Sequence, residues 1–256
     1  MHLKSDDIIR LVLDFDSGAV PAPFSHVFKL KLNFDKNFIN TQFEIQYTDR
    51  DDLSEEEILN EGFSLEDDYN FIGELPQVWE QPFKTLYSQS KWSNKKSPDL
   101  SGGIKVMAKD LHGKIARTVP LNQKDWQYLT QEYIQAIYEI DQKEAPLQIG
   151  YKIISADGQE TQLGFKVKFS NRKIDFYSGE EKKEVAWEEV KPLLNYIFIP
   201  DYNYELASES PPRKPGTYID CGDGFWHEFG KGVINVNDSF DAISKIKAEF
   251  MRLNQL

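Results

Sequence analysis

The sequence predicts an α+β protein of two halves, each an antiparallel sheet of hairpins packed with helices. Segments in which apolar and polar residues alternate occur in both halves of the 256-residue chain, and segments of helical spacing follow them. The chain is 40% hydrophobic and 13% aromatic, which is enough apolar surface to form a folded core. We expect an N-terminal half over 1–143 and a C-terminal half over 147–256.

Three strands are predicted near the start of the chain, over 8–15, 27–34 and 38–47. Each alternates apolar and polar residues, which is typical of an antiparallel sheet with one face in water. Pro21 and Pro23 favour a loop between the first two strands, because proline cannot donate a hydrogen bond to a neighbouring strand.

The rest of the N-terminal half is predicted to hold three helices and one hairpin. Ser54 and Glu57 have the spacing of a capping box, which predicts a short acidic helix. Apolar residues at helical spacing predict a helix over 79–87 and a longer one over 122–140. A hairpin over 103–119 separates these two helices.

The C-terminal half is predicted to contain the same kinds of element. Strands over 147–155 and 161–169 flank an Asp-Gly pair, which suits a tight hairpin turn. A helix is expected over 187–196, and a hairpin over 217–236 precedes a closing helix that starts at Asp238.

Four pairs of short matches, in the same order and 108 to 120 residues apart, indicate a degenerate internal repeat. The pairs are Thr41 with Thr161, Trp79 with Trp187, Gly103 with Gly216, and Asn122 with Asn237. Each match is weak alone, so the repeat is a prediction that depends on their common order.

Composition and charge exclude several classes of protein. Cys221 is the only cysteine, so an intrachain disulfide and a cysteine-rich zinc site are excluded. The N-terminus has no apolar core of an export signal, and no stretch of about 20 apolar residues could span a bilayer. The net charge of −12 argues against binding nucleic acid through a general basic surface. We therefore expect a soluble, cytoplasmic protein with no membrane or nucleic-acid partner.

The negative charge is concentrated in one place. Ten acids and one base lie between Asp49 and Asp68, so this acidic segment carries −9 of the −12. Its spacing does not fit a calcium loop, which needs a glycine at its sixth position and a terminal glutamate. A solvated helix face and a docking surface for a basic protein are the remaining interpretations. The predicted binding residues are Asp51, Asp52, Glu55, Glu56, Glu57, Asp67, Asp68 and Tyr69.

One hairpin, over 220–228, contains residues with catalytic chemistry. If Asp223 and Gly224 form a two-residue turn, Asp220 faces His227 and orients it as a general base. The same register places Cys221 on the opposite face, which argues against a Cys-His nucleophile. The alternative is a glycine-rich structural hairpin with a buried thiol.

The sequence contains no phosphate loop, dinucleotide fingerprint, nucleophile elbow or zinc-binding helix, so we predict no cofactor and no metal site. The leading hypothesis is a non-enzymatic interaction module, of the inhibitor or immunity type, that binds a basic partner through the acidic segment. Two alternatives stay open: a hydrolase-like enzyme at the 220–228 hairpin, and a small-molecule binder in a groove between the halves. The sequence does not indicate the partner's identity or the oligomeric state.

Overall fold

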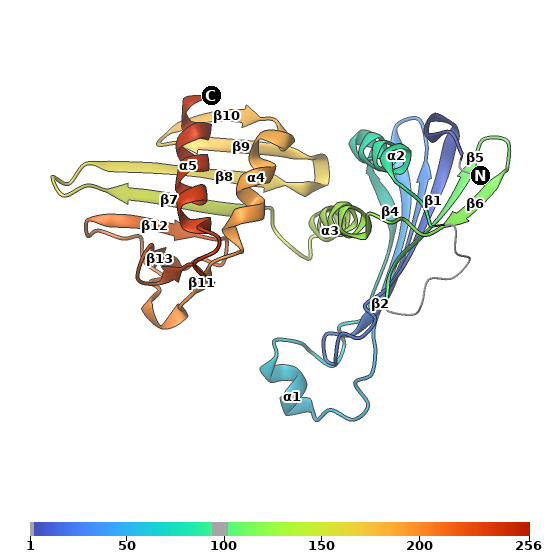
Figure 1. Ribbon diagram of the computed structural model, residues 1–256, viewed down its shortest axis with the longest axis horizontal. Helices are drawn as coiled ribbons and strands as arrows, with labels where there is room; N and C mark the ends of the chain where they lie inside the picture. The colour runs from blue at the N-terminus through green and yellow to red at the C-terminus, as the bar shows by residue number, and fades with distance from the viewer. Residues whose placement is uncertain (1–2, 94–101) are drawn as a thin grey trace. The chain divides into compact units, whose positions relative to one another are not determined.

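The structure is a computed structural model that describes residues 3–93 and 102–256. The chain divides into two compact units, unit 1 (Met1–Glu144) and unit 2 (Ala145–Leu256), which are described separately here. Each unit has a six-stranded antiparallel sheet packed with helices (Figure 1), so the predicted α+β class with two similar halves is confirmed. Among the described residues, no helix is both long and apolar enough to cross a membrane.

The sheet of unit 1 has the strand order β4-β3-β2-β1-β5-β6, and every neighbouring pair is antiparallel. Its strands are β1 (Ile8–Asp16), β2 (His26–Phe34), β3 (Phe38–Tyr47), β4 (Tyr69–Pro76), β5 (Gly103–Asp110) and β6 (Ile115–Thr118). The first three and the β5–β6 hairpin were predicted from the alternation. The edge strand β4 was not.

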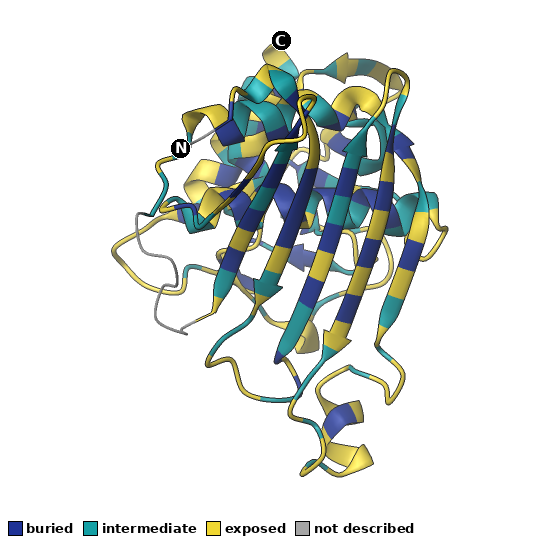
Figure 2. Cartoon of the chain, turned by 90° about the vertical axis from the view of Figure 1, so that its right-hand side faces the viewer, coloured by how far each residue is buried: buried dark blue, intermediate teal, exposed yellow. Residues whose placement is uncertain are grey.

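Register keeps one face of this sheet apolar. Leu30 of β2 lies opposite Leu13 of β1 on one side and Phe43 of β3 on the other, and all three are buried. Figure 2 shows the resulting alternation of buried and exposed residues along the strands, which is interrupted in β1, where Leu11, Val12 and Leu13 are all buried. Because successive side chains point to opposite faces, the polar residues between them form a second, open face.

Two of the described helices of unit 1 cover the apolar face of this sheet. Unit 1 contains α1 (Glu55–Asn60), α2 (Glu80–Gln89) and α3 (Gln123–Ile140). Figure 1 shows the sheet edge-on, with α2 and α3 on the same side. The fully buried Phe83 of α2 and Trp126 and Tyr133 of α3 fill the core between these helices and the sheet.

Unit 2 has the corresponding strand order β10-β9-β8-β7-β12-β13. Its elements are β7 (Leu147–Ile154), β8 (Glu160–Lys168), β9 (Lys173–Ser178), β10 (Glu181–Val185), β12 (Gly216–Asp220), β13 (Trp226–Glu228), α4 (Trp187–Ile197) and α5 (Ala242–Gln255). A small extra ladder joins β11 (Asp201–Tyr202) to β14 (Val233–Ile234). The core centres on Phe250 of α5, whose ring stacks on Tyr151 at 4.2 Å.

Apart from α1 in unit 1 and the β11–β14 ladder in unit 2, the two units run through the same series of elements: four strands, a helix, two strands and a final helix. Gly103 and Gly216 both begin the fifth strand of their sheets, and Trp79 and Trp187 both stand where the helix after the fourth strand starts. Asn122 is the N-cap of α3, but Asp241, not Asn237 or Asp238, caps α5. Thr41 lies in a third strand and Thr161 in a second, so this pair is not equivalent. Descent of the two halves from one repeat stays a prediction.

Candidate functional site

The acidic segment connects two neighbouring strands of unit 1. It leaves the sheet at the end of β3 and returns at the start of β4, and α1 forms its middle. Figure 1 shows α1 beyond the end of the sheet. The corresponding connection in unit 2, between β9 and β10, consists of Gly179 and Glu180 alone. The acidic segment is therefore an excursion from the sheet.

A capping box starts helix α1, as predicted. The Ser54 hydroxyl accepts a hydrogen bond from the Glu57 amide at 3.3 Å, and the Glu57 carboxylate accepts one from the Ser54 amide at 2.8 Å. These hydrogen bonds from the Ser54 amide and hydroxyl lower the pKa of Glu57. Ile58 is the one buried residue of this six-residue helix, so the cap and a single apolar anchor fix its position.

Arg50, the only base of the segment, ties its two ends together. The Arg50 Nη1 donates to Asp67 Oδ2 at 2.8 Å and to the Ser64 carbonyl at 3.1 Å. Burial favours a raised pKa for the Asp67 carboxyl, but hydrogen bonds from Arg50 and Ser64 outweigh burial and lower it. The ion pair is mostly buried, with Arg50 13% and Asp67 21% exposed.

The same guanidinium fastens the segment to the loop before β2. Its Nε and Nη2 both donate to the Pro23 carbonyl, at 3.1 and 2.9 Å. The Arg50 Cζ atom also lies 4.3 Å from the ring centre of Tyr47 and 4.9 Å from that of Phe63. Arg50 thus neutralises one carboxylate of the segment, that of Asp67, and fixes the conformation of the segment against the loop before β2.

The predicted binding residues divide into two groups. The first group makes hydrogen bonds or ion pairs that stabilise the fold, and it consists of Glu57, Asp67, Asp68 and Tyr69. Asp68 accepts from the Tyr47 amide at 2.8 Å, and the Tyr69 hydroxyl donates to Asp141 at 2.8 Å. The others are exposed, and no hydrogen bond or ion pair engages their carboxylates among the described residues. This exposed group consists of Asp51, Asp52, Glu55 and Glu56.

Two exposed leucines lie among these acids and were not considered from the sequence. Leu59 of α1 is 51% exposed, and Leu65 is 60% exposed. Phe24, in the loop that Arg50 contacts, is 43% exposed and packs edge-on against Phe63. Leu65 stands between polar residues in the sequence, so its exposure could have been foreseen. Leu59 could not, because it follows Ile58 and either residue could have faced the core.

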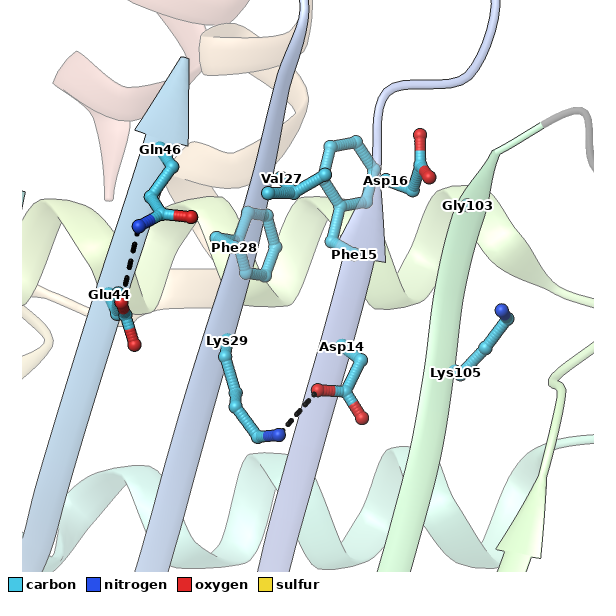
Figure 3. Close-up of a pocket in the computed structure, with 10 residues that line it drawn as sticks. All are labelled: Asp14, Phe15, Asp16, Val27, Phe28, Lys29, Glu44, Gln46, Gly103 and Lys105. Carbon is cyan, nitrogen blue, oxygen red and sulfur yellow. Dashed lines mark hydrogen bonds and ion pairs between the residues drawn. The ribbon is translucent and has the colours of Figure 1, made fainter. Parts of the chain in front are cut away.

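An open hollow of about 320 Å³ lies on the uncovered face of the same sheet (Figure 3). Across its floor, charges alternate from strand to strand in the order Lys105, Asp14, Lys29 and Glu44. Lys29 and Asp14 form an exposed ion pair at 3.3 Å. The sequence could not reveal this row, because it depends on the register of four strands. The row is balanced in charge and adds no net charge to the acidic segment.

The 220–228 hairpin does not have the predicted register. Asp220 lies opposite Trp226, and His227 lies opposite Ile219. The turn is wider than an Asp-Gly turn because the Asp220 carboxylate accepts from the Gly222 amide at 2.8 Å and the Gly224 amide at 3.2 Å. Residues one apart on a strand point to opposite faces, so the predicted pairing of Asp220 with His227 is wrong.

His227 is enclosed instead by aromatic rings. It is fully buried, and the rings of Tyr202 and Tyr204 stand edge-on to it at 5.1 and 5.0 Å. Neither ring nitrogen makes a hydrogen bond to any described residue. The nearest carboxylate is that of Asp223, 3.9 Å from Nε2, and Asp223 already accepts from the Tyr204 hydroxyl. A general base needs an orienting partner and access to substrate, and this arrangement supplies neither.

The neighbouring thiol is also unsuited to nucleophilic chemistry. Burial raises the pKa of Cys221 to about 12, so the thiol stays protonated at neutral pH. Within the described part of the chain, no three His, Cys, Asp or Glu side chains are grouped to hold a metal ion. The hairpin is best explained as a structural element of unit 2.

The chain matches no protein-family model, no curated protein and no solved structure. Its function has to be argued from its own residues, since fold class alone does not specify function. The acidic segment is the region where exposed charge, exposed apolar side chains and a fixed conformation coincide.

Proposed function

We propose that this protein is a non-enzymatic interaction module that binds a basic partner protein through the acidic segment, as an inhibitor or immunity-type factor does. The observation that carries the proposal is that one segment, clamped by Arg50, exposes Leu59, Leu65 and four carboxylates that have no partner among the described residues. A segment that served only solubility would need neither the leucines nor the clamp.

The charge favours association with a basic surface. Clustered like charges raise the rate at which an oppositely charged partner arrives, and this steering weakens as salt is added. The exposed group lies within six residues of chain, from Asp51 to Glu56, so the negative electrostatic field comes from one short stretch of the segment. In the free protein these carboxylates repel one another, and a basic partner would relieve that repulsion.

The two exposed leucines can supply the apolar contacts that the charged residues lack. Charged contacts on the rim of an interface mainly set the association rate, whereas buried apolar anchors set the lifetime of the complex. Leu59 and Leu65 are the exposed apolar residues of the acidic segment that can serve as such anchors. The capping box and the Arg50 clamp support this role, because a preorganised surface loses less entropy on binding.

A capture experiment with two matched variants tests the proposal. The first variant neutralises the exposed group (Asp51→Asn, Asp52→Asn, Glu55→Gln, Glu56→Gln). The second makes the same change in charge on exposed glutamates of unit 2 (Glu180→Gln, Glu181→Gln, Glu205→Gln, Glu209→Gln). Proteins captured by the wild-type chain from an extract of its own cells at low salt are purified, and their affinity for all three chains is measured.

We expect a basic protein whose affinity falls about tenfold or more with the first variant and stays nearly constant with the second. A partner that binds the first variant as tightly as the wild type contradicts the proposal, and so does failure to recover any basic protein. Kinetics refine the result: neutralised acids should slow association, and Leu59→Ser with Leu65→Ser should speed dissociation.

A further inference from the structure

The strand β4 leaves one edge of the sheet of unit 1 open. Among the described residues, β4 pairs with β3 along one side, and no strand pairs with its other side. Such an edge presents unpaired backbone N–H and C=O groups, which act as a template for another strand. Proteins commonly protect these edges with charged side chains, proline, bulges or short strands.

The corresponding edge of unit 2 has this protection and β4 does not. Four of the five residues of β10 are charged. In the eight residues of β4, the one charged residue is Glu74, and the one proline, Pro76, stands at its end. Ile72, in the middle of β4, is 82% exposed, more than any other large hydrophobic residue in the described chain. An exposed edge with an apolar centre and a single charged residue indicates a strand-pairing site.

We propose that β4 pairs antiparallel with β4 of a second copy of this chain, about a twofold axis at Ile72. In this register Ile72 faces Ile72 of the second copy, and Asn70 faces Glu74, whose carboxylate can accept from the amide. The register uses the whole stretch from Tyr69 to Leu75 symmetrically, so no residue of this stretch is left without a counterpart.

The other face of β4 also suits self-pairing. Phe71 is placed opposite Gly73 of the second copy, so the two Phe71 side chains do not face each other across the pair. Within each chain the Phe71 ring lies over Gly73, since a Cβ on Gly73 would lie 2.5 Å from Phe71 Cζ. The face therefore has no side chain at 73 that could obstruct the second copy.

Charge selects the antiparallel arrangement. The acidic segment ends immediately before Tyr69, so a parallel pair would place two segments of charge −9 side by side. Antiparallel pairing separates them by the length of the strands and reduces their repulsion. An edge of this length buries a small area, so the dimer should be weak and in rapid exchange. The pairing uses none of the four carboxylates assigned to the basic partner.

Sedimentation of the full chain over a range of concentrations tests the proposal. We expect the wild type to self-associate as concentration rises to about 0.5 mM, the range of a weak edge interface. Ile72→Lys should weaken this association at least tenfold, because two lysines would meet at the axis. Ile115→Lys, on the opposite edge strand of the same sheet, is the matched control and should leave it unchanged. A wild type that stays monomeric throughout overturns the proposal.

Cysteine cross-linking tests the register independently. Under oxidation Ile72→Cys should form a disulfide-linked dimer, because directly opposed residues bring their Cα atoms about 4.5–5.5 Å apart. Asn70→Cys should not, since its two copies lie four residues apart across the axis. The oxidised wild type shows what Cys221 contributes. Equal cross-linking of the two variants, or none with Ile72→Cys, contradicts the proposed register.

Discussion

The two units have the same strand order but differ in the connection between their third and fourth strands. Unit 2 makes this connection with Gly179 and Glu180, whereas unit 1 uses the residues from 48 to 68. Unit 2 pairs its third and fourth strands across this two-residue connection, so a long acidic segment is not needed for such a pair to form. Lengthening a surface loop costs little stability, so such an insertion is tolerated and can be retained for binding.

The edge strands that follow these connections differ in the same way. Unit 2 ends its sheet with the charged strand β10, and unit 1 ends its sheet with the apolar-centred strand β4. The shared elements therefore form a frame, and the features that favour interaction are concentrated on one side of unit 1.

The largest expected effects are in the two cores. Phe83→Ala in unit 1 and Phe250→Ala in unit 2 each remove a fully buried ring and should each cost about 3–5 kcal/mol in free energy of unfolding. If each unit has its own independent core, each substitution should lower the hydrogen-exchange protection of its own unit far more than that of the other. Denaturation followed by region-resolved hydrogen exchange measures this. Equal loss in both units would mean that they unfold as one.

The second expected effect is on the clamp. Arg50→Ala removes the hydrogen bonds to Asp67, Ser64 and Pro23, so hydrogen-exchange protection over 49–68 should fall about tenfold or more. The matched control is Arg252→Ala, which removes a guanidinium that pairs with Glu189 and Glu249 in unit 2. It should leave the acidic segment unchanged. Unaltered protection in Arg50→Ala would show that the segment does not depend on the clamp.

Sequence patterns predicted the strands whose side chains separate cleanly by face. In β2 and β3 one face is apolar and the other polar, so the alternation is visible. It is also visible in β1, although Val12 is buried between Leu11 and Leu13. The same reasoning missed β4, where Ile72 puts a large apolar residue on the polar face. It also missed β10, in which Val185 is the one apolar residue beside four charged ones. These two edge strands escaped prediction because each pairs with only one strand, so its composition does not have to follow the alternation. The edge strand β6 was predicted because it forms a hairpin with β5.

The candidate site was predicted in part. Charge alone located the acidic segment, and the spacing of Ser54 and Glu57 predicted its helix. Composition could not show that Arg50 donates to Asp67 and that the Tyr47 amide donates to Asp68, since both hydrogen bonds depend on the tertiary structure. The 220–228 register failed for a similar reason: two amides bonded to the Asp220 carboxylate widened the turn, and the resulting shift by one residue put Asp220 and His227 on opposite faces.

A smaller effect should appear with pH. Hydrogen bonds lower the pKa of Asp67 in the folded protein below its ordinary value of 3.8. The folded segment therefore binds a proton less readily than the unfolded one, and its stabilisation is complete above that value and lost as pH falls below it. We expect protection over 49–68 to fall about fivefold between about pH 5 and pH 3 after correction for intrinsic exchange. Asp67→Asn should flatten this dependence. A profile that keeps its slope in Asp67→Asn would assign the effect to other carboxyls.

The smallest expected effects compare two buried polar groups. In unit 1 the Tyr133 hydroxyl lies 2.6 Å from Thr41 Oγ1, and both residues are buried. Tyr133→Phe should cost about 1 kcal/mol, because one buried hydrogen bond is lost while Thr41 keeps its bond to the Ile39 carbonyl.

In unit 2, His227 has no hydrogen-bond partner for either ring nitrogen among the described residues. His227→Phe keeps a flat ring between Tyr202 and Tyr204 and removes two unpaired polar atoms, so stability should stay level or rise by about 0.5 kcal/mol. Opposite signs for Tyr133→Phe and His227→Phe in chemical denaturation at neutral pH are the expected result. A clear loss of stability in His227→Phe would mean that the imidazole makes a stabilising polar interaction in unit 2. The interpretation of the 220–228 hairpin as a purely structural element would then fail.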